Sequence, residues 1–157
     1  MAIDKTQIKG GLFDVFLAAR VSSETAPAQP TLATVDAGGD ATWIYAGALS
    51  ENQPTLDAGT PNVINLHDGT QKQLSVPWKL EFEALQLNKL STFEGMLDSY
   101  VDAIFVKRGT SSATRYNRLG LAVGYKHGST KEASRIPVTL TAVSGKVSDL
   151  RSEITLI

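Results

Sequence analysis

The sequence contains no cysteine, and this absence excludes three kinds of chemistry. Disulfide frameworks, thiolate zinc sites and cysteine nucleophiles all require that residue. Long hydrophobic runs are also absent. No window approaches the roughly 18 apolar residues of a membrane span, and the N-terminal segment lacks the apolar core of a signal peptide. We therefore expect a soluble, unexported protein with no membrane partner.

Histidine is scarce, because the chain has only two. Neither His67 nor His127 has a carboxylate at metal-ligand spacing, so we expect no metal site. His67 precedes Asp68, but adjacent strand residues point to opposite faces and no serine stands in a nucleophile elbow. The glycines form no phosphate-binding loop followed by a lysine. We therefore expect no catalytic, cofactor-binding or metal-binding residues, and a protein that is not an enzyme.

One pair of carboxylates could in principle serve acid–base chemistry. Glu81 and Glu83 lie two residues apart, which on one face of a strand places them about 7 Å apart. Lys79 shares that face, and nothing in the surrounding sequence would bury the carboxylates and shift a pKa. We interpret them as part of a solvated outer face.

A chain of 157 residues is most simply one domain, residues 1–157, with room for a sizeable core. Alternation of apolar and polar residues predicts several strands. Leu12 to Val21 is apolar on both faces, which indicates a strand that is buried from both sides or lies at a subunit contact. The other expected strands are Thr31 to Val35, Ala41 to Ala46, Asn62 to His67, Leu74 to Ala84, Ala103 to Val106, Arg118 to Lys126, Ile136 to Val143 and part of Val147 to Ile157.

One segment has a helical period instead. From Leu90 to Val101 the apolar residues recur at three and four, behind a capping box formed by Ser91 and Glu94. We expect a helix over residues 91–102. The fold class is therefore mainly β (α+β): an antiparallel β-sandwich or barrel-like arrangement of sheets with one flanking helix.

Three features interrupt this regular pattern. Pro77 cannot donate a ladder hydrogen bond, so its strand is expected to lie at an edge or to contain a bulge. Residues 47–61 read as a connection that is unusually long for a compact domain, and either form an irregular excursion or an arm that orders on a neighbouring subunit. Both termini carry apolar residues, and we expect the C-terminal ones to be docked.

Charge is segregated along the chain despite a net charge of −1. Asp36 to Asp102 carries ten acids and three bases, whereas Lys107 to Arg135 carries seven bases and one acid. One interpretation is two solvated faces of different sign. Another is a head-to-tail contact between subunits, which closes into a ring or continues as a filament. A third is polyanion binding by a polar loop at 107–117, with Arg108, Arg115 and Arg118 as the contacts.

Four segments together resemble the tail tube proteins of long-tailed bacteriophages. They are the alternating run LSVPWKLEFEAL, the helical pattern LSTFEGMLDSYV, the strand DAIFVKRG and the late strand IPVTLTAVSG, which together span residues 73–145. The resemblance implies a virion structural protein that forms hexameric rings, stacked head to tail into a tube through which DNA passes. It also implies contacts with other tail proteins, transient non-specific DNA contact in the lumen, assembly in the host cytoplasm and localisation in the virion tail. Tail terminators and hub rings of the same fold fit nearly as well.

The expected subunit contacts lie in the first strand, the long connection, the proline-containing strand and the C-terminus. They are Leu12, Phe13, Val15, Phe16, Leu49, Pro54, Leu56, Pro77, Ile154, Leu156 and Ile157. The alternative function is a carbohydrate- or protein-binding β-sandwich in which Trp43 and Trp78 form an aromatic platform. Both tryptophans have apolar alternating neighbours, which favours a place in the core.

Overall fold

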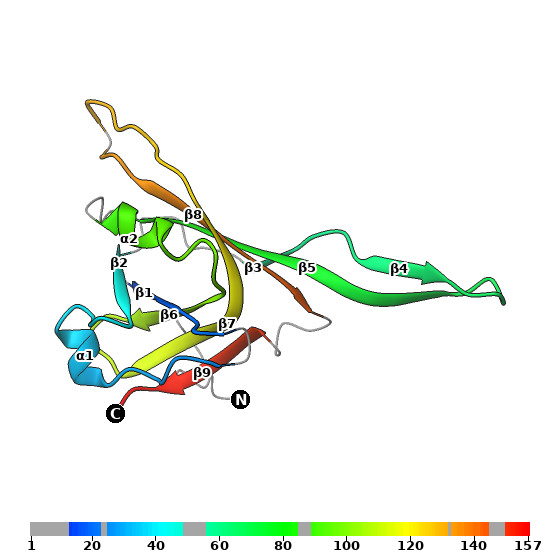
Figure 1. The fold of residues 1–157 in the computed structure, drawn as a ribbon, viewed down its shortest axis with the longest axis horizontal. Helices are drawn as coiled ribbons and strands as arrows, with labels where there is room; N and C mark the ends of the chain where they lie inside the picture. The colour runs from blue at the N-terminus through cyan, green and yellow to red at the C-terminus, as the bar shows by residue number, and fades with distance from the viewer. Residues whose placement is uncertain (1–12, 23–24, 49–55, 85–88, 132, 145–149) are drawn as a thin grey trace, which may run out of the picture.

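The computed structural model describes residues 13–22, 25–48, 56–84, 89–131, 133–144 and 150–157. Within these ranges the chain forms a mainly β, antiparallel fold with two short helices (Figure 1). This confirms the expected fold class, with two helices instead of one. The strands are β1 (Phe13–Ala19), β2 (Ile44–Ala48), β3 (Leu56–Ala58), β4 (Asn62–Asn65), β5 (Gln71–Ala84), β6 (Val101–Lys107), β7 (Ser112–Val123), β8 (Ile136–Ser144) and β9 (Arg151–Thr155), and the helices are α1 (Leu32–Asp36) and α2 (Leu90–Glu94).

One long strand, β7, joins the two halves of the sheet. The strand order is β2-β1-β6-β7-β8-β5-β3, with β4 also paired to β5 and β9 to β7. The first part of β7 pairs with β6 and β9, and its last part, Gly120 to Val123, pairs with β8. In Figure 1 this strand curves from the lower part of the body to the upper part. The sheet therefore folds over itself and encloses a core.

The change of direction in β7 coincides with a bulge. Val101 pairs with Leu119 while Ala103 pairs with Tyr116, so β7 has one extra residue opposite β6. Arg118 lies in this bulge with a φ of 54°, a left-handed conformation that is uncommon for residues with a Cβ. Bulges bend a strand and increase its twist. The backbone of β7 therefore changes direction where it passes from one half of the sheet to the other.

Two hydrophobic clusters pack on opposite faces of β1 and β6. The larger lies between the two halves of the sheet and includes Val15, Leu17 and Phe105. The smaller lies under α1 and the C-terminus and includes Phe16, Trp43 and Ile104. Successive strand residues point to opposite faces. A strand with apolar residues at consecutive positions can therefore serve both clusters, which confirms the expectation that the first strand is buried from both sides.

The expected helix over residues 91–102 is much shorter. It ends at Glu94, and Ser91 is not its N-cap, because Lys89 takes that position without a side-chain hydrogen bond. Val101 already belongs to β6, where it pairs with Ala19 and Leu119. Strand pairing on both sides of Val101 overrides the local helical period.

Two other segments differ from expectation. Thr31 to Val35, expected as a strand, instead contains helix α1, and the Thr31 hydroxyl caps it by accepting a hydrogen bond from the Thr34 N–H. The loop expected at 107–117 is mostly strand, because β7 begins at Ser112. Polar residues alternate with buried ones in this part of β7, since only one of its faces meets the core.

Pro77 lies inside the sheet, because β5 is paired on both sides. It pairs with Val143 of β8, and on the other side its carbonyl accepts the Gly59 N–H at 2.6 Å. The expected edge position is therefore wrong, whereas the alternative of an irregular pairing holds: Ala58 pairs with Trp78 and Asn62 with Ser75, so three residues lie opposite two at this point. A residue's N–H and C=O point to the same side of an antiparallel strand. The proline nitrogen therefore faces the gap between the end of β3 and the start of β4, where no ladder bond is required.

The long connection expected at 47–61 is partly regular structure. Gly47 and Ala48 belong to β2, and Leu56–Ala58 form β3 on β5. Residues 49–55 lie outside the described part of the chain.

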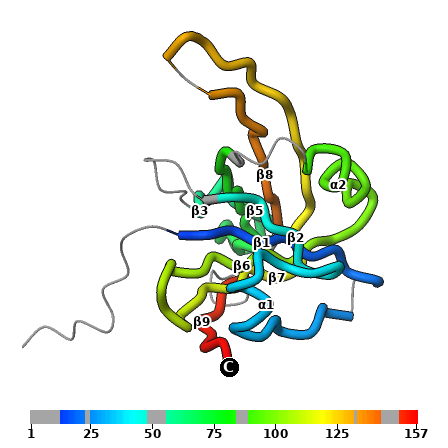
Figure 2. Tube along the Cα trace, turned by 90° about the vertical axis from the view of Figure 1, so that its left-hand side faces the viewer, coloured from blue at the N-terminus to red at the C-terminus, as the bar shows by residue number. Residues whose placement is uncertain are grey.

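Two hairpins project from the body (Figure 1). The longer, residues 62–74, contains β4 and the first residues of β5, and we call it the long arm. The shorter joins β7 to β8, and we call residues 124–131 and 133–135 the short arm. Every residue of the long arm is exposed. Figure 1 shows both arms extending beyond the body, and in Figure 2 the short arm again stands clear of it.

We predict that two leucines on the same face of β5 differ strongly in their contribution to stability. Leu80 is fully buried in the larger cluster, whereas Leu74 is 54 % exposed on the long arm. Leu80→Ala should lower the free energy of unfolding by about 2–5 kcal/mol, and Leu74→Ala should change it by less than about 0.5 kcal/mol. Urea denaturation followed by circular dichroism measures both. Equal losses would show that the arm is packed against the body.

Candidate functional site

The residues weighed for catalysis do not form a reactive site. His67 lies exposed at the turn of the long arm, beside Asp68. Glu83 pairs with Arg135 at 2.5 Å and with Lys126 at 3.7 Å, and the Arg135 hydrogen bond is the largest influence that lowers the pKa of Glu83. Glu81 pairs with Lys79 and is largely exposed. The two carboxylates therefore have separate cationic partners.

The described ranges contain no group of three or more histidine, aspartate or glutamate side chains placed to hold a metal ion. None of the helices in those ranges is long and apolar enough to cross a membrane.

The two tryptophans do not form an exposed platform. Trp43 is only 2 % exposed, its Nε1–H donates to the Ala28 carbonyl at 2.9 Å, and it belongs to the smaller cluster. Trp78 lies half-buried on β5. A sugar ring stacks on an aromatic face that is open to solvent. Burial of Trp43 therefore removes the basis of the carbohydrate-binding alternative.

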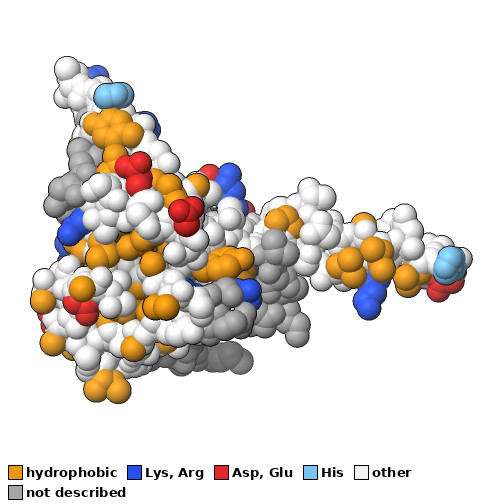
Figure 3. All heavy atoms as spheres, viewed as in Figure 1, with side chains coloured by type: hydrophobic (Ala, Val, Ile, Leu, Met, Phe, Trp, Pro, Cys, Tyr) orange, Lys and Arg blue, Asp and Glu red, His pale blue; other side chains and the backbone are white. Residues whose placement is uncertain are grey.

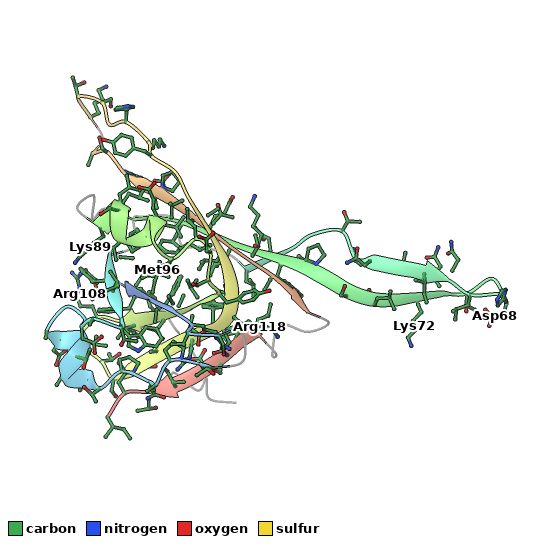
Figure 4. All side chains as sticks on the ribbon, viewed as in Figure 1. Asp68, Lys72, Lys89, Met96, Arg108 and Arg118 are labelled. Atoms are coloured by element: carbon green, nitrogen blue, oxygen red, sulfur yellow. The ribbon has the colours of Figure 1, made fainter. Side chains whose placement is uncertain are left out.

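The three arginines expected to contact a polyanion do not form one basic surface. Arg108 pairs with Asp14 at 2.6 Å. Arg115 is buried, and Arg118 stacks over the Tyr100 ring at 5.2 Å. Figure 4 places Arg108 and Arg118 on opposite sides of the body. Arg115 is therefore inaccessible to a polyanion, whereas polyanion contact by Arg108 and Arg118 stays a prediction.

Arg115 belongs instead to a buried network around Asp102. The Asp102 carboxylate accepts hydrogen bonds from Arg20 Nε at 2.6 Å, from Arg115 Nη2 at 2.5 Å and from the backbone N–H of Arg118 at 2.9 Å. Arg115 also donates to the Pro27 carbonyl and lies over the Trp43 ring. Burial alone would raise the pKa of Asp102, but these hydrogen bonds outweigh it and hold the pKa below its ordinary value.

Part of the charge that is segregated in sequence is paired in space. Asp102 of the acidic segment meets Arg115 of the basic segment, and Glu83 meets Arg135. Antiparallel pairing of β6 with β7, and of β5 with β8, brings these residues together. Two acids of the acidic segment, Asp102 and Glu83, are therefore neutralised by cations of the basic segment.

The residues expected at subunit contacts have varied surroundings. Val15, Phe16 and Leu156 are buried within the chain, and Phe13, Leu56 and Ile154 pack partly against its core. The Leu156 N–H donates to the Ser111 carbonyl, so the C-terminal end of the chain is docked as expected. Ile157 is 95 % exposed. Leu12, Leu49 and Pro54 lie outside the described residues, and a role in subunit contact stays a prediction for the whole set.

The long arm carries the most unusual surface of the described residues. Ile64 pairs with Lys72, and the Leu66 N–H donates to the Thr70 carbonyl at 2.8 Å. Cross-strand partners point to the same face. Ile64 and Leu66 therefore share one face with Leu74 and with Lys72, and the three apolar side chains are between 42 % and 54 % exposed. The opposite face carries Val63 among polar residues: Asn65, Gln71, Gln73 and Ser75.

This apolar face is continuous with the core. Along β5, Leu74 is followed two residues later by Val76, which is buried, and then by Leu80 and Phe82 of the larger cluster. Figure 3 shows hydrophobic side chains grouped along the arm beyond the body. The face of β5 that packs against the core in the body is therefore exposed to solvent on the long arm.

Sequence reasoning found the strand and the turn of this arm but missed its exposed surface. The available signal was the Asp68–Gly69 turn between β-prone runs, followed by a strand of 14 residues. Strands in compact domains are usually about 5–6 residues long. A strand of that length is expected to extend beyond the body of a small domain.

No protein-family model matches the chain, and no curated protein matches its sequence.

We predict a large loss of stability when the charge of Asp102 is removed. Asp102→Asn leaves Arg20 and Arg115 without their buried counter-ion, which typically costs about 3–5 kcal/mol. Glu81→Gln, the same chemical change in the exposed pair with Lys79, should cost less than about 1 kcal/mol. Urea denaturation at pH 7 compares the two variants. Similar losses would contradict the central role assigned to Asp102.

The same network predicts a pH dependence. Because the folded-state pKa of Asp102 is lowered, its contribution is complete above the unfolded pKa of about 3.9 and is lost as the pH falls through the folded value. The difference in unfolding free energy between the wild type and Asp102→Asn should therefore shrink below about pH 4. Denaturation series from pH 7 to pH 2 measure that difference. A constant difference would contradict the lowered pKa.

Proposed function

We propose that the protein is a structural subunit that assembles with copies of itself, and that the assembly is a stack of rings of the kind that forms a bacteriophage tail tube. The long arm carries this proposal. The exposed apolar face of the long arm lies on the same side of β5 as the residues that pack in the larger cluster. An isolated two-stranded hairpin is at best marginally stable in water. A neighbouring subunit that covers this face would stabilise the arm and join the two copies.

The energetics favour contact between several copies. Covering half-exposed Ile64, Leu66 and Leu74 contributes about 1 kcal/mol each from apolar burial. The stabilisation from one arm is small. Each subunit in a ring or stack, however, places its own long arm on one neighbour and covers the long arm of another. Repeated weak contacts produce a strong assembly when geometry lets them form together.

The remaining surfaces agree with a structural role. The charged residues considered for catalysis are engaged in ion pairs, as Glu83 is with Arg135, and the described residues offer no metal-ligand cluster. Strand β2 is at one end of the sheet order, so its outer edge can pair with another strand. In this proposal the partners are identical subunits in a hexameric ring, other virion tail proteins and, transiently, DNA in the lumen.

We predict that the two faces of the long arm respond differently to the same change of charge. Ile64→Asp with Leu74→Asp places two carboxylates on the apolar face, whereas Asn65→Asp with Gln73→Asp places two on the polar face. Sedimentation velocity over a wide range of concentrations should show association of the wild type and of the polar-face variant. The apolar-face variant should stay monomeric and unfold at the same urea concentration as the wild type.

Negative-stain microscopy of the same samples tests the finer proposal. Rings or tubes from the wild type and the polar-face variant, and none from the apolar-face variant, would support it. A wild type that is monomeric at every concentration would contradict self-assembly, and irregular aggregates would contradict the ring.

A further inference from the structure

The turn of the long arm contains the only Asp–Gly pair in the sequence, Asp68–Gly69, and the sequence has no Asn–Gly pair. Figure 4 shows Asp68 at the far end of the arm, where every residue is exposed. Glycine has no side chain to obstruct the approach of its own nitrogen to the carboxyl group before it. Asp68 is therefore the aspartate of this chain that is least hindered from reacting with the backbone.

An aspartate followed by glycine isomerises to isoaspartate through a cyclic imide. The Gly69 nitrogen forms a bond to Asp68 Cγ, and the hydroxyl group of the protonated carboxyl leaves with the amide proton as water. Water then adds to the main-chain carbonyl carbon of Asp68, and the bond from that carbon to the Gly69 nitrogen breaks. The backbone then passes through Cβ and Cγ of residue 68, with no net gain or loss of atoms.

The folded turn engages both of the groups that would react. The Gly69 N–H donates to the Leu66 carbonyl at 3.0 Å, and Gly69 has a φ of 86°, as in a hairpin loop that ends in a bulge. Asp68 Oδ1 accepts hydrogen bonds from the Thr70 N–H at 3.0 Å and from the Thr70 hydroxyl at 2.6 Å. In the imide Gly69 has no proton to donate and Asp68 has no charge. The hydrogen bonds of the turn therefore stabilise the unreacted chain relative to the ring.

Thr70 also keeps the carboxyl group in its less reactive form. The hydrogen bond from the Thr70 hydroxyl, followed by that from its backbone N–H, lowers the pKa of Asp68. Ring closure needs the protonated carboxyl group, because an ionised one would have to expel an oxide ion. A lower pKa leaves less of the protonated form at any pH above it.

We infer that Asp68 is a site of isoaspartate formation that the closed turn of the long arm suppresses, with the Thr70 hydroxyl as the protecting group. The inference depends on the turn alone and is independent of the proposed function. Isoaspartate adds one main-chain atom between Leu66 and Thr70, whose backbones are joined by a hydrogen bond of 2.8 Å. Because Leu66 belongs to the apolar face, opening of the turn would lead to a lasting change at the outer end of that face.

Two substitutions of Thr70 test the protecting role. T70V removes the hydroxyl and keeps the branched shape and the backbone N–H, whereas T70S keeps the hydroxyl. At pH 6, folded T70V should form isoaspartate at residue 68 about three to ten times faster than the wild type, and T70S should stay within about twofold of it. The wild type unfolded in urea should react faster than any folded sample. Digestion with a protease that cleaves before aspartate but not before isoaspartate, followed by mass spectrometry, measures each rate.

Asp98 provides a control within the same digest. It is exposed and is followed by Ser99, another small residue. Its rate of isomerisation should be the same in the wild type, T70V and T70S, because Thr70 forms no hydrogen bond with it. All samples are kept at a concentration at which sedimentation velocity shows only the monomer, so that self-association does not affect the rates.

Each outcome bears on one step of the inference. A faster reaction in T70V alone, with an unchanged rate at Asp98, would support it. A folded wild type that reacts as fast as the unfolded chain would overturn protection by the turn. Equal rates in the wild type and T70V, or an increase at Asp98 that matches the increase at Asp68, would overturn the role of the Thr70 hydroxyl. None of these results would decide whether the subunits assemble.

Discussion

The fold depends on one buried carboxylate. Asp102 lies in β6 beside the bulge of β7, and it binds two arginines and the backbone N–H of Arg118. That N–H belongs to the residue with the left-handed conformation, so the carboxylate holds the backbone where β7 changes direction. A buried charge with fully formed hydrogen bonds contributes specificity of arrangement even where it adds little net stability. Here the arrangement it specifies is the relation between the two halves of the sheet.

The network around Asp102 lies in the interior because β1 and β6 are buried on both faces. Because β1 and β6 bury residues on both faces, the sheet needs cover on its second face, which α1 and the C-terminal residues provide. The Arg115 side chain lies between the sheet and this cover. Its guanidinium group lies over the Trp43 ring and forms an ion pair with Asp102. The smaller cluster and the ion network are therefore parts of one structure.

Period-two patterns in the sequence predicted most strands well, because burial of alternate residues is a local property of a half-buried strand. Leu74 to Ala84 and Ile136 to Val143 agree closely with β5 and β8. The helix was overestimated because strand pairing at Val101 is decided by residues far away in sequence. Long-range pairing also explains why Arg115 was expected in an exposed loop, since its buried partner Asp102 is visible only in the folded chain.

The candidate surfaces were less predictable than the fold. A sequence shows that Ile64 and Leu74 are apolar, but not that the hairpin carrying them extends beyond the body. The sequence-level segregation of charge likewise concealed pairing between neighbouring strands.

The geometry of the long arm links its length to its orientation. Only β5 runs unbroken from the body into the arm, because the partner side is interrupted between β3 and β4 next to Pro77. Two residues added to each strand of the hairpin would move its tip outward by about 7 Å and keep the apolar face on the same side. One residue added to each would turn that face to the opposite side. The spacing of an assembly built on this arm could therefore change only in steps of two residues, while the body stays the same.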